Sequence, residues 1–88
     1  MAEDLIEFYG IECTFCKKME PLIEKLEEEL NIKITRLEVW HNEKNAQLMQ
    51  QLDQGYCGGV PFFINKKTGK KICGAASFDQ LKAWALGK

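Results

Sequence analysis

Two cysteines three residues apart, Cys13 and Cys16, stand between a short apolar run and a long amphipathic segment. The run at residues 5–9 carries β-favouring side chains and stops at Gly10, which predicts a buried strand. After the pair, apolar residues recur at steps of three and four, which predicts a helix of about four turns. These residues are Cys16, Met19, Ile23, Leu26 and Leu30. A Cys-x-x-Cys pair at such a junction restricts both the fold and the chemistry.

The positions of the two cysteines predict different roles for them. Residues three apart on a helix have Cβ atoms about 5–6 Å apart, so a disulfide can close with little backbone movement. Cys13 is expected at the helix N-terminus, where unpaired N–H groups and the helix dipole favour a thiolate. Cys16 lies one turn later on the apolar stripe and suits the resolving role. The pair predicts thiol–disulfide exchange, with Cys13 as the attacking group.

The rest of the chain alternates strand and helix signals. In order, these are a strand at 32–39, a polar helix at 43–53, strands at 60–64 and 70–73, and a helix after a Ser77–Gln80 capping box. The alternation of residues 32–39 slips, so their buried face is not settled. The predicted order is β-α-β-α-β-β-α, with a parallel first half and an antiparallel hairpin, in one α/β domain covering residues 1–88.

Composition excludes several classes of partner. Twelve Lys and Arg against thirteen Asp and Glu give a net charge of −1, which argues against nucleic acid or an anionic membrane. No apolar run approaches spanning length, and the first residues carry acids instead of a basic leader region. We therefore expect a monomeric protein of the cytoplasm or another reducing intracellular compartment, with no bound cofactor.

The other two cysteines, Cys57 and Cys73, stand far from the pair and from each other in the sequence. Zinc is the alternative use of a close cysteine pair, but these spacings do not complete a zinc site and His41 is remote in the sequence, so no metal is expected. Cys57 is interpreted as either a regulatory thiol or a small buried hydrophobe, and Cys73 as a packing residue.

Three separated motifs resemble the thioredoxin family, and the similarity covers nearly the whole chain. They are the Cys13-Thr14-Phe15-Cys16 pair with Pro21 eight residues beyond Cys13, the Gly59-Val60-Pro61 step, and Gly74 after the hairpin. The resemblance implies a thioredoxin fold, in which three helices flank a four-stranded mixed sheet. It also implies a cis Pro61 facing the disulfide, and a substrate contact formed by Thr14, Phe15, Val60 and Pro61.

The resemblance further assigns a role to Glu7, which lies six residues before Cys13. Thioredoxins keep a buried acid there, which assists proton transfer at the resolving cysteine. They also keep a nearby lysine, and the similarity puts Arg36 in its place. A buried carboxyl would have a raised pKa and act as a general base. The alternative is a solvent-facing Glu7 on a strand with one wet face.

The function implied is reduction of protein disulfides through a Cys13 mixed disulfide that Cys16 resolves, with thioredoxin reductase as a plausible electron donor. The motif departs from the family because Glu12 precedes Cys13 and the usual Trp and Pro are missing. Two alternatives stay open. A glutaredoxin-like, glutathione-coupled enzyme is disfavoured because Gly74-Ala75-Ala76-Ser77 lacks an acidic pair, and a non-enzymatic binding or adaptor module would use the Val60–Pro61 face alone.

Overall fold

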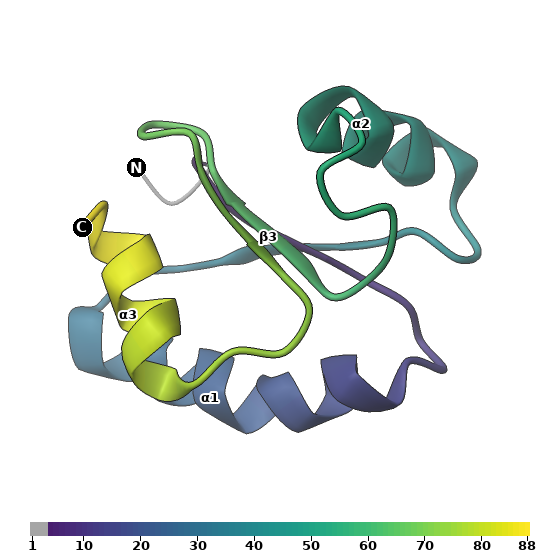
Figure 1. Cartoon of the computed structure of the whole chain (residues 1–88). Coiled ribbons are helices and arrows are strands. Elements are labelled where there is room, and N and C mark those ends of the chain that lie inside the picture. The colour runs from purple at the N-terminus through teal and green to yellow at the C-terminus, as the bar shows by residue number, and fades with distance from the viewer. Residues whose placement is uncertain (1–3) are drawn as a thin grey trace.

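Four strands and three helices make up the part of the chain that the computed structural model describes, residues 4–88 (Figure 1). In chain order the elements are β1 Leu5–Tyr9, α1 Thr14–Leu30, β2 Thr35–Glu38, α2 Glu43–Asp53, β3 Phe62–Asn65, β4 Lys70–Cys73 and α3 Phe78–Leu86. The predicted order β-α-β-α-β-β-α is confirmed. Within these residues, no helix is both long and apolar enough to span a membrane.

The strands form one mixed sheet in the order β2-β1-β3-β4. β1 pairs with β2 in parallel and with β3 antiparallel, and β3 pairs antiparallel with β4. The parallel first half and the hairpin are therefore as predicted. β2 is an edge strand, and all four of its residues are half-buried. This uniform, partial burial explains why the sequence of residues 32–39 did not indicate one buried face.

Helices cover both faces of the sheet, with α1 and α3 on one side and α2 on the other (Figure 1). Successive side chains of a strand point to opposite faces, so β1 and β3 contribute to two cores. Leu5 and Phe63 pack in the core beneath α1 and α3, whereas Ile6 and Phe8 pack in the core against α2. Any polar side chain in the middle of β1 must therefore also be buried.

The ends of the elements follow local chemistry. α1 begins at Thr14, two residues before the first apolar position of the predicted stripe, and contains Pro21, which is exposed. α2 has the predicted bounds and is capped by Asn42. The capping box of α3 is present. β3 begins at Phe62, two residues later than predicted, because Pro61 has no N–H to give to a strand ladder.

Candidate active site at Cys13 and Cys16

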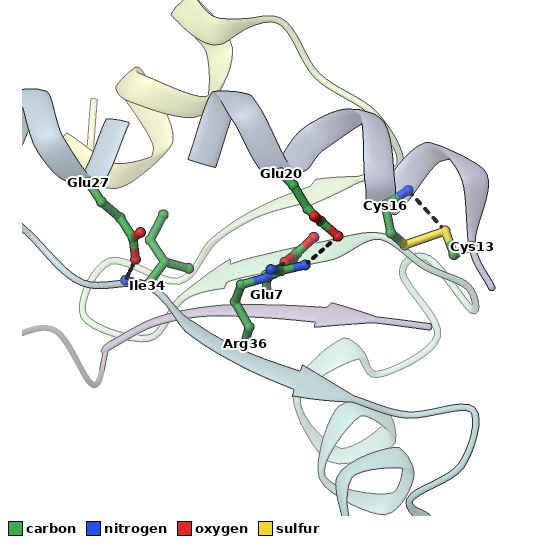
Figure 2. Close-up of polar contacts among 7 residues, drawn as sticks. All are labelled: Glu7, Cys13, Cys16, Glu20, Glu27, Ile34 and Arg36. Atoms are coloured by element: carbon green, nitrogen blue, oxygen red, sulfur yellow. Dashed lines mark hydrogen bonds and ion pairs between the residues drawn. A yellow bond between two sulfur atoms is a disulfide. The ribbon is translucent and has the colours of Figure 1, made fainter. Parts of the chain in front are cut away.

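Cys13 and Cys16 form a disulfide at the start of α1, with Cα atoms 5.2 Å apart. Cys13 is the N-cap residue of the helix, and the backbone N–H of Cys16 donates to its Sγ at 3.1 Å (Figure 2). A first-turn N–H group thus points at the Cys13 sulfur, which is the arrangement that favours a thiolate. Cys13 is 5% exposed and Cys16 is 1% exposed, so Cys13 is the more accessible sulfur.

The Val60–Pro61 step lies against this disulfide. Its peptide bond is cis, as the family resemblance implied. The Sγ of Cys13 is 3.9 Å from the backbone oxygen of Val60. On its other side the step is tied to the end of β4, because the N–H of Gly74 donates to the oxygen of Pro61 at 2.8 Å. Two predicted site residues from distant segments, Cys13 and Val60, are therefore in contact.

Glu7 is buried beneath α1, with no exposed surface. The alternative of a solvent-facing Glu7 was wrong because β1 is central and α1 covers that face of it. In the parallel register Glu7 pairs with Arg36 on β2, and Arg36 Nε donates to Glu7 Oε1 at 2.7 Å. Arg36 Nη2 also lies 3.6 Å from Glu20, one helical turn after Cys16 (Figure 2).

Burial raises the pKa of Glu7 to about 7, although the hydrogen bond and charge of Arg36 oppose the rise. The second carboxyl oxygen of Glu7, Oε2, is buried and accepts no hydrogen bond from any of residues 4–88. Figure 2 shows this carboxyl below α1, the helix that carries Cys13 and Cys16. A buried carboxyl with a pKa near neutrality and a free oxygen can take up or release one proton at physiological pH.

Comparisons with known proteins agree with this geometry. The family model described as Thioredoxin matches residues 2–86. The chain belongs to the thioredoxin family. Among solved structures it is similar to a mutant thioredoxin from Halobacterium salinarum, with 27% sequence identity and a TM-score of 0.63. The similarity covers 89% of this chain and 66% of that thioredoxin, so the chain spans just under two thirds of its length. No curated protein matches the chain.

The surface around this thioredoxin site carries aromatic groups that the sequence analysis only partly identified. Thr14 and Phe15 are exposed, and the Phe15 side chain is 58% exposed. Trp40 was not assigned to the site, yet its ring packs against Gly10 in the loop that precedes Cys13, and a Cβ on Gly10 would overlap it. Gly10, which follows the first strand, was the sequence signal of this close contact, because a residue with a Cβ would not fit against the ring. A tryptophan thus lies close to the active-site loop, although none precedes Cys13 in the sequence.

Glu12, the acid that departs from the usual thioredoxin motif, pairs with His41, a residue far from it in the sequence. His41 Nε2 lies 2.8 Å from Glu12 Oε1, so the histidine that was taken as remote lies beside the active-site loop. The hydrogen bond with Glu12 raises the pKa of His41, and the hydrogen bond with His41 lowers the pKa of Glu12.

Together with Glu38, Glu12 and His41 offer possible metal-ligand atoms that lie within 4.8 Å of one another. Glu38 already accepts backbone N–H groups of residues 11, 40 and 41, which accounts for its orientation without a metal.

Cys57 and Cys73 form a second disulfide, with Cα atoms 5.3 Å apart. The interpretation of Cys57 as a mere buried hydrophobe, and of Cys73 as a packing residue, was therefore wrong, whereas a regulatory role for Cys57 stays a prediction. The β3–β4 register sets Cys73 opposite Phe62, and the segment between α2 and β3 brings Cys57 to the same place. Since this proximity depends on strand pairing, a separation of 16 residues gave no signal for it in the sequence.

Proposed function

We propose that this member of the thioredoxin family reduces disulfide bonds in proteins through Cys13 and Cys16. The observation that carries the proposal is the position of the Cys13 sulfur. It caps the N-terminus of α1 and lies 3.9 Å from the Val60 oxygen beside a cis proline. A nucleophilic sulfur next to the backbone of a half-exposed residue just before a strand can align a substrate strand and attack its disulfide.

The reaction consists of two thiol–disulfide exchanges. The Cys13 thiolate attacks one sulfur of the substrate disulfide, which forms a mixed disulfide and releases the other substrate sulfur as a thiolate that takes up a proton. The Cys16 thiolate then attacks the Cys13 sulfur and releases the second substrate thiolate. The substrate gains two electrons and two protons, and the protein is left with the Cys13–Cys16 disulfide. A thioredoxin reductase or a dithiol would return it to the reduced state.

Glu7 supplies the general base in this scheme. Cys16 is 1% exposed, so bulk water does not readily accept its proton. The Glu7 carboxyl, with a pKa of about 7 and an unpaired Oε2, takes the proton when Cys16 becomes the attacking thiolate. Arg36, hydrogen-bonded to the other oxygen, holds the carboxyl in place and keeps the ionised form accessible despite burial.

Substrate recognition is proposed to use the Val60 backbone and the exposed side chains of Thr14 and Phe15. Val60 is half-exposed, and Phe15 offers an apolar contact beside the reacting sulfur. These features fit an extended peptide better than glutathione, because the region from Gly74 to Ser77 has no acidic pair for a glutathione amino group. The expected setting is the cytoplasm or another reducing compartment, where a reductase keeps such a couple reduced.

The test is reduction of insulin with dithiothreitol as the electron donor. The chain should accelerate reduction, Cys13→Ser should abolish the acceleration, and Cys16→Ser should accumulate a mixed disulfide that peptide mapping locates at Cys13. An unmodified chain that gives no acceleration would overturn the proposal. In that case, partner binding that survives loss of both thiols would identify an adaptor, and rapid turnover of glutathione mixed disulfides would identify a glutathione-coupled enzyme.

A further inference from the structure

The second disulfide differs from the active-site disulfide in its access to solvent. Cys13 and Cys16 are both buried, whereas Cys57 is half-buried and Cys73 is exposed. Small thiols and disulfides therefore reach the Cys57–Cys73 pair more readily than the active-site pair. Exchange rates depend on access to the sulfur and on the thiolate fraction of the attacking group. On the first of these criteria, Cys73 is the most accessible cysteine of the chain.

The surroundings of Cys73 also favour its thiolate. Cys73 and Lys71 are two residues apart on β4, so their side chains point to the same face of the sheet. The Lys71 ammonium remains on that face, where it lies 3.4 Å from the backbone oxygen of Asp53 and 5.6 Å from the centre of the Tyr56 ring. A nearby cation lowers the cost of the thiolate form. Its exposure therefore makes Cys73 the sulfur of this pair that small thiols and disulfides reach first.

The pair is coupled to the substrate-facing step by a short ring of bonds. Cys57 precedes Val60 by three residues, and Cys73 precedes Gly74, whose N–H binds the oxygen of Pro61. The Cys57–Cys73 bond closes this ring around Val60 and Pro61. The backbone that faces the Cys13 sulfur is therefore held covalently to the end of β4.

Between Cys57 and Val60, the two glycines of this segment make few side-chain contacts. Gly58 and Gly59 are exposed, and a Cβ on either would meet no atom within 4 Å. Cys57 and Val60 pack against the core on the α2 side. The N–H groups of Cys57 and Gly58 each donate a hydrogen bond of 2.7 Å to the carboxylate of Asp53. Two successive glycines have a large conformational freedom to lose on ordering. Closure of the disulfide removes that freedom before a substrate binds.

We propose that Cys57 and Cys73 are a second thiol–disulfide site, which exchanges with small-molecule disulfides and thiols and sets whether the Val60–Pro61 step is held ready for substrate. In the closing direction, the Cys73 thiolate attacks a small disulfide and releases one thiol. The Cys57 thiolate then attacks the Cys73 sulfur and releases the second thiol. The small disulfide is reduced to two thiols, and the protein dithiol is oxidised to the Cys57–Cys73 bond. The effect on catalysis rests on the proposed function, whereas the exchange reaction does not.

The exchange reaction is tested in a Cys13→Ser/Cys16→Ser chain equilibrated with buffers from fully oxidised to fully reduced glutathione. Alkylation and mass measurement then give the fraction of the second pair that is closed. The proposal expects both states, with the dithiol replacing the disulfide as the reduced share of glutathione rises. A pair that stays closed in every buffer is a structural crosslink, and a pair that never closes is not a redox site, so either result overturns the proposal. Peptide mapping of the unmodified chain under the same buffers repeats the test without substitutions.

The effect on catalysis is tested in the oxidising direction, and the mapping follows both disulfides, so that only molecules in which the second pair is still closed are counted. The fully oxidised chain is mixed with a reduced dithiol peptide, and loss of the Cys13–Cys16 bond is followed by quenching and mapping. Cys57→Ser, Cys73→Ser and the double variant should each react about fivefold more slowly, because each removes the same preorganising bond. Equal rates in all four chains, or an effect confined to one single variant, would refute the coupling. An unmodified chain that does not react at Cys13–Cys16 would refute the proposed function, while the glutathione titration would still decide the second site.

Discussion

The imidazole Nε2 of His41 lies within 2.9 Å of both carboxylate oxygens of Glu12, the residue that precedes Cys13. An unpaired Glu12 would disfavour the Cys13 thiolate by like-charge repulsion. The protonated imidazole compensates for this charge, and Lys17 adds a weaker opposing charge to Glu12. Because the pKa of His41 is raised, the compensation persists toward neutral pH and is lost as the pH rises through that pKa.

Replacement of His41 should therefore slow the reaction of the reduced Cys13 thiol. We expect His41→Ala to reduce the rate of alkylation of Cys13 at neutral pH by about two- to threefold, since the pair is exposed and screened by salt. The measurement is the alkylation rate against pH in a Cys16→Ser background. Glu12→Gln is the matched control, because His41→Ala should have no effect once the charge of Glu12 is gone. An equal loss in both backgrounds would refute a role through Glu12.

Glu7→Gln should slow release of substrate from the mixed disulfide. The amide keeps the shape of the side chain but cannot accept the Cys16 proton, and loss of a general base costs roughly ten- to a hundredfold or more. The release rate of the unmodified chain should rise with pH through an inflection near 7, the pKa of Glu7, and this inflection should disappear in the variant. Glu20→Gln, which changes the other acid beside Arg36, should retain the inflection. A variant that keeps the same pH profile would exclude Glu7 as the base.

The same carboxyl should make the folded state less stable as the pH rises. The pKa of Glu7 is about 7 in the folded chain and about 4.5 when it is unperturbed. Between these values the folded state binds more protons than the unfolded state, so the free energy of unfolding falls with increasing pH. Relative to Glu7→Gln, the unmodified chain should lose about 3 kcal/mol between pH 4 and pH 8. Urea denaturation of both chains at several pH values measures this difference in the free energy of unfolding. A difference that does not change with pH, or that changes in favour of the unmodified chain as the pH rises, would contradict the assigned burial.

Sequence reasoning identified the fold because its signals were local or evenly spaced. The apolar steps of α1, the capping box at Ser77 and the Val60–Pro61 step each depend on few neighbouring residues. Glu7 was left undecided because an isolated strand does not reveal whether one or both of its faces are covered. The strand order, with β1 inside the sheet and helices on both sides, settles that question.

The parts that were missed all depend on chain segments that meet only after folding. Trp40 and His41 reach the active-site loop because β2 runs parallel to β1 and both strands end on the same side of the sheet. Cys57 and Cys73 meet because the β3–β4 hairpin returns beside the segment after α2. No spacing in the sequence encodes these distances, since each is set by strand register and connection length.

Gly10→Ala tests the position of Trp40. A Cβ at residue 10 would overlap the indole ring, so the ring must move away from the active-site loop. We expect a loss of about 1–2 kcal/mol in the free energy of unfolding and a changed Trp40 fluorescence. In a Trp84→Phe background Trp40 is the remaining tryptophan, so the fluorescence measured comes from its ring. Gly59→Ala is the matched control, because its Cβ would enter open space. Unchanged fluorescence in Gly10→Ala would show that the ring does not pack there.

Asp53 holds the segment that leads to the second disulfide, and its replacement should release that segment. The side chain is 4% exposed, and its two oxygens accept the N–H groups of Cys57 and Gly58. Asp53→Ala leaves both donors without a partner and should cost about 3 kcal/mol in the free energy of unfolding.

Asp53→Asn retains one acceptor and should cost about half as much. Asp79→Ala, in the exposed first turn of α3, is the control and should cost less than about 1 kcal/mol in the free energy of unfolding. Hydrogen exchange at the Cys57 and Gly58 amides separates the local effect from global unfolding, because both amides should lose protection before the core strands do. If the two amides kept their protection in Asp53→Ala, the covalent bond to Cys73 alone would be sufficient to order the segment. The Val60–Pro61 step would then depend on the redox state of that bond more strongly than on any hydrogen bond.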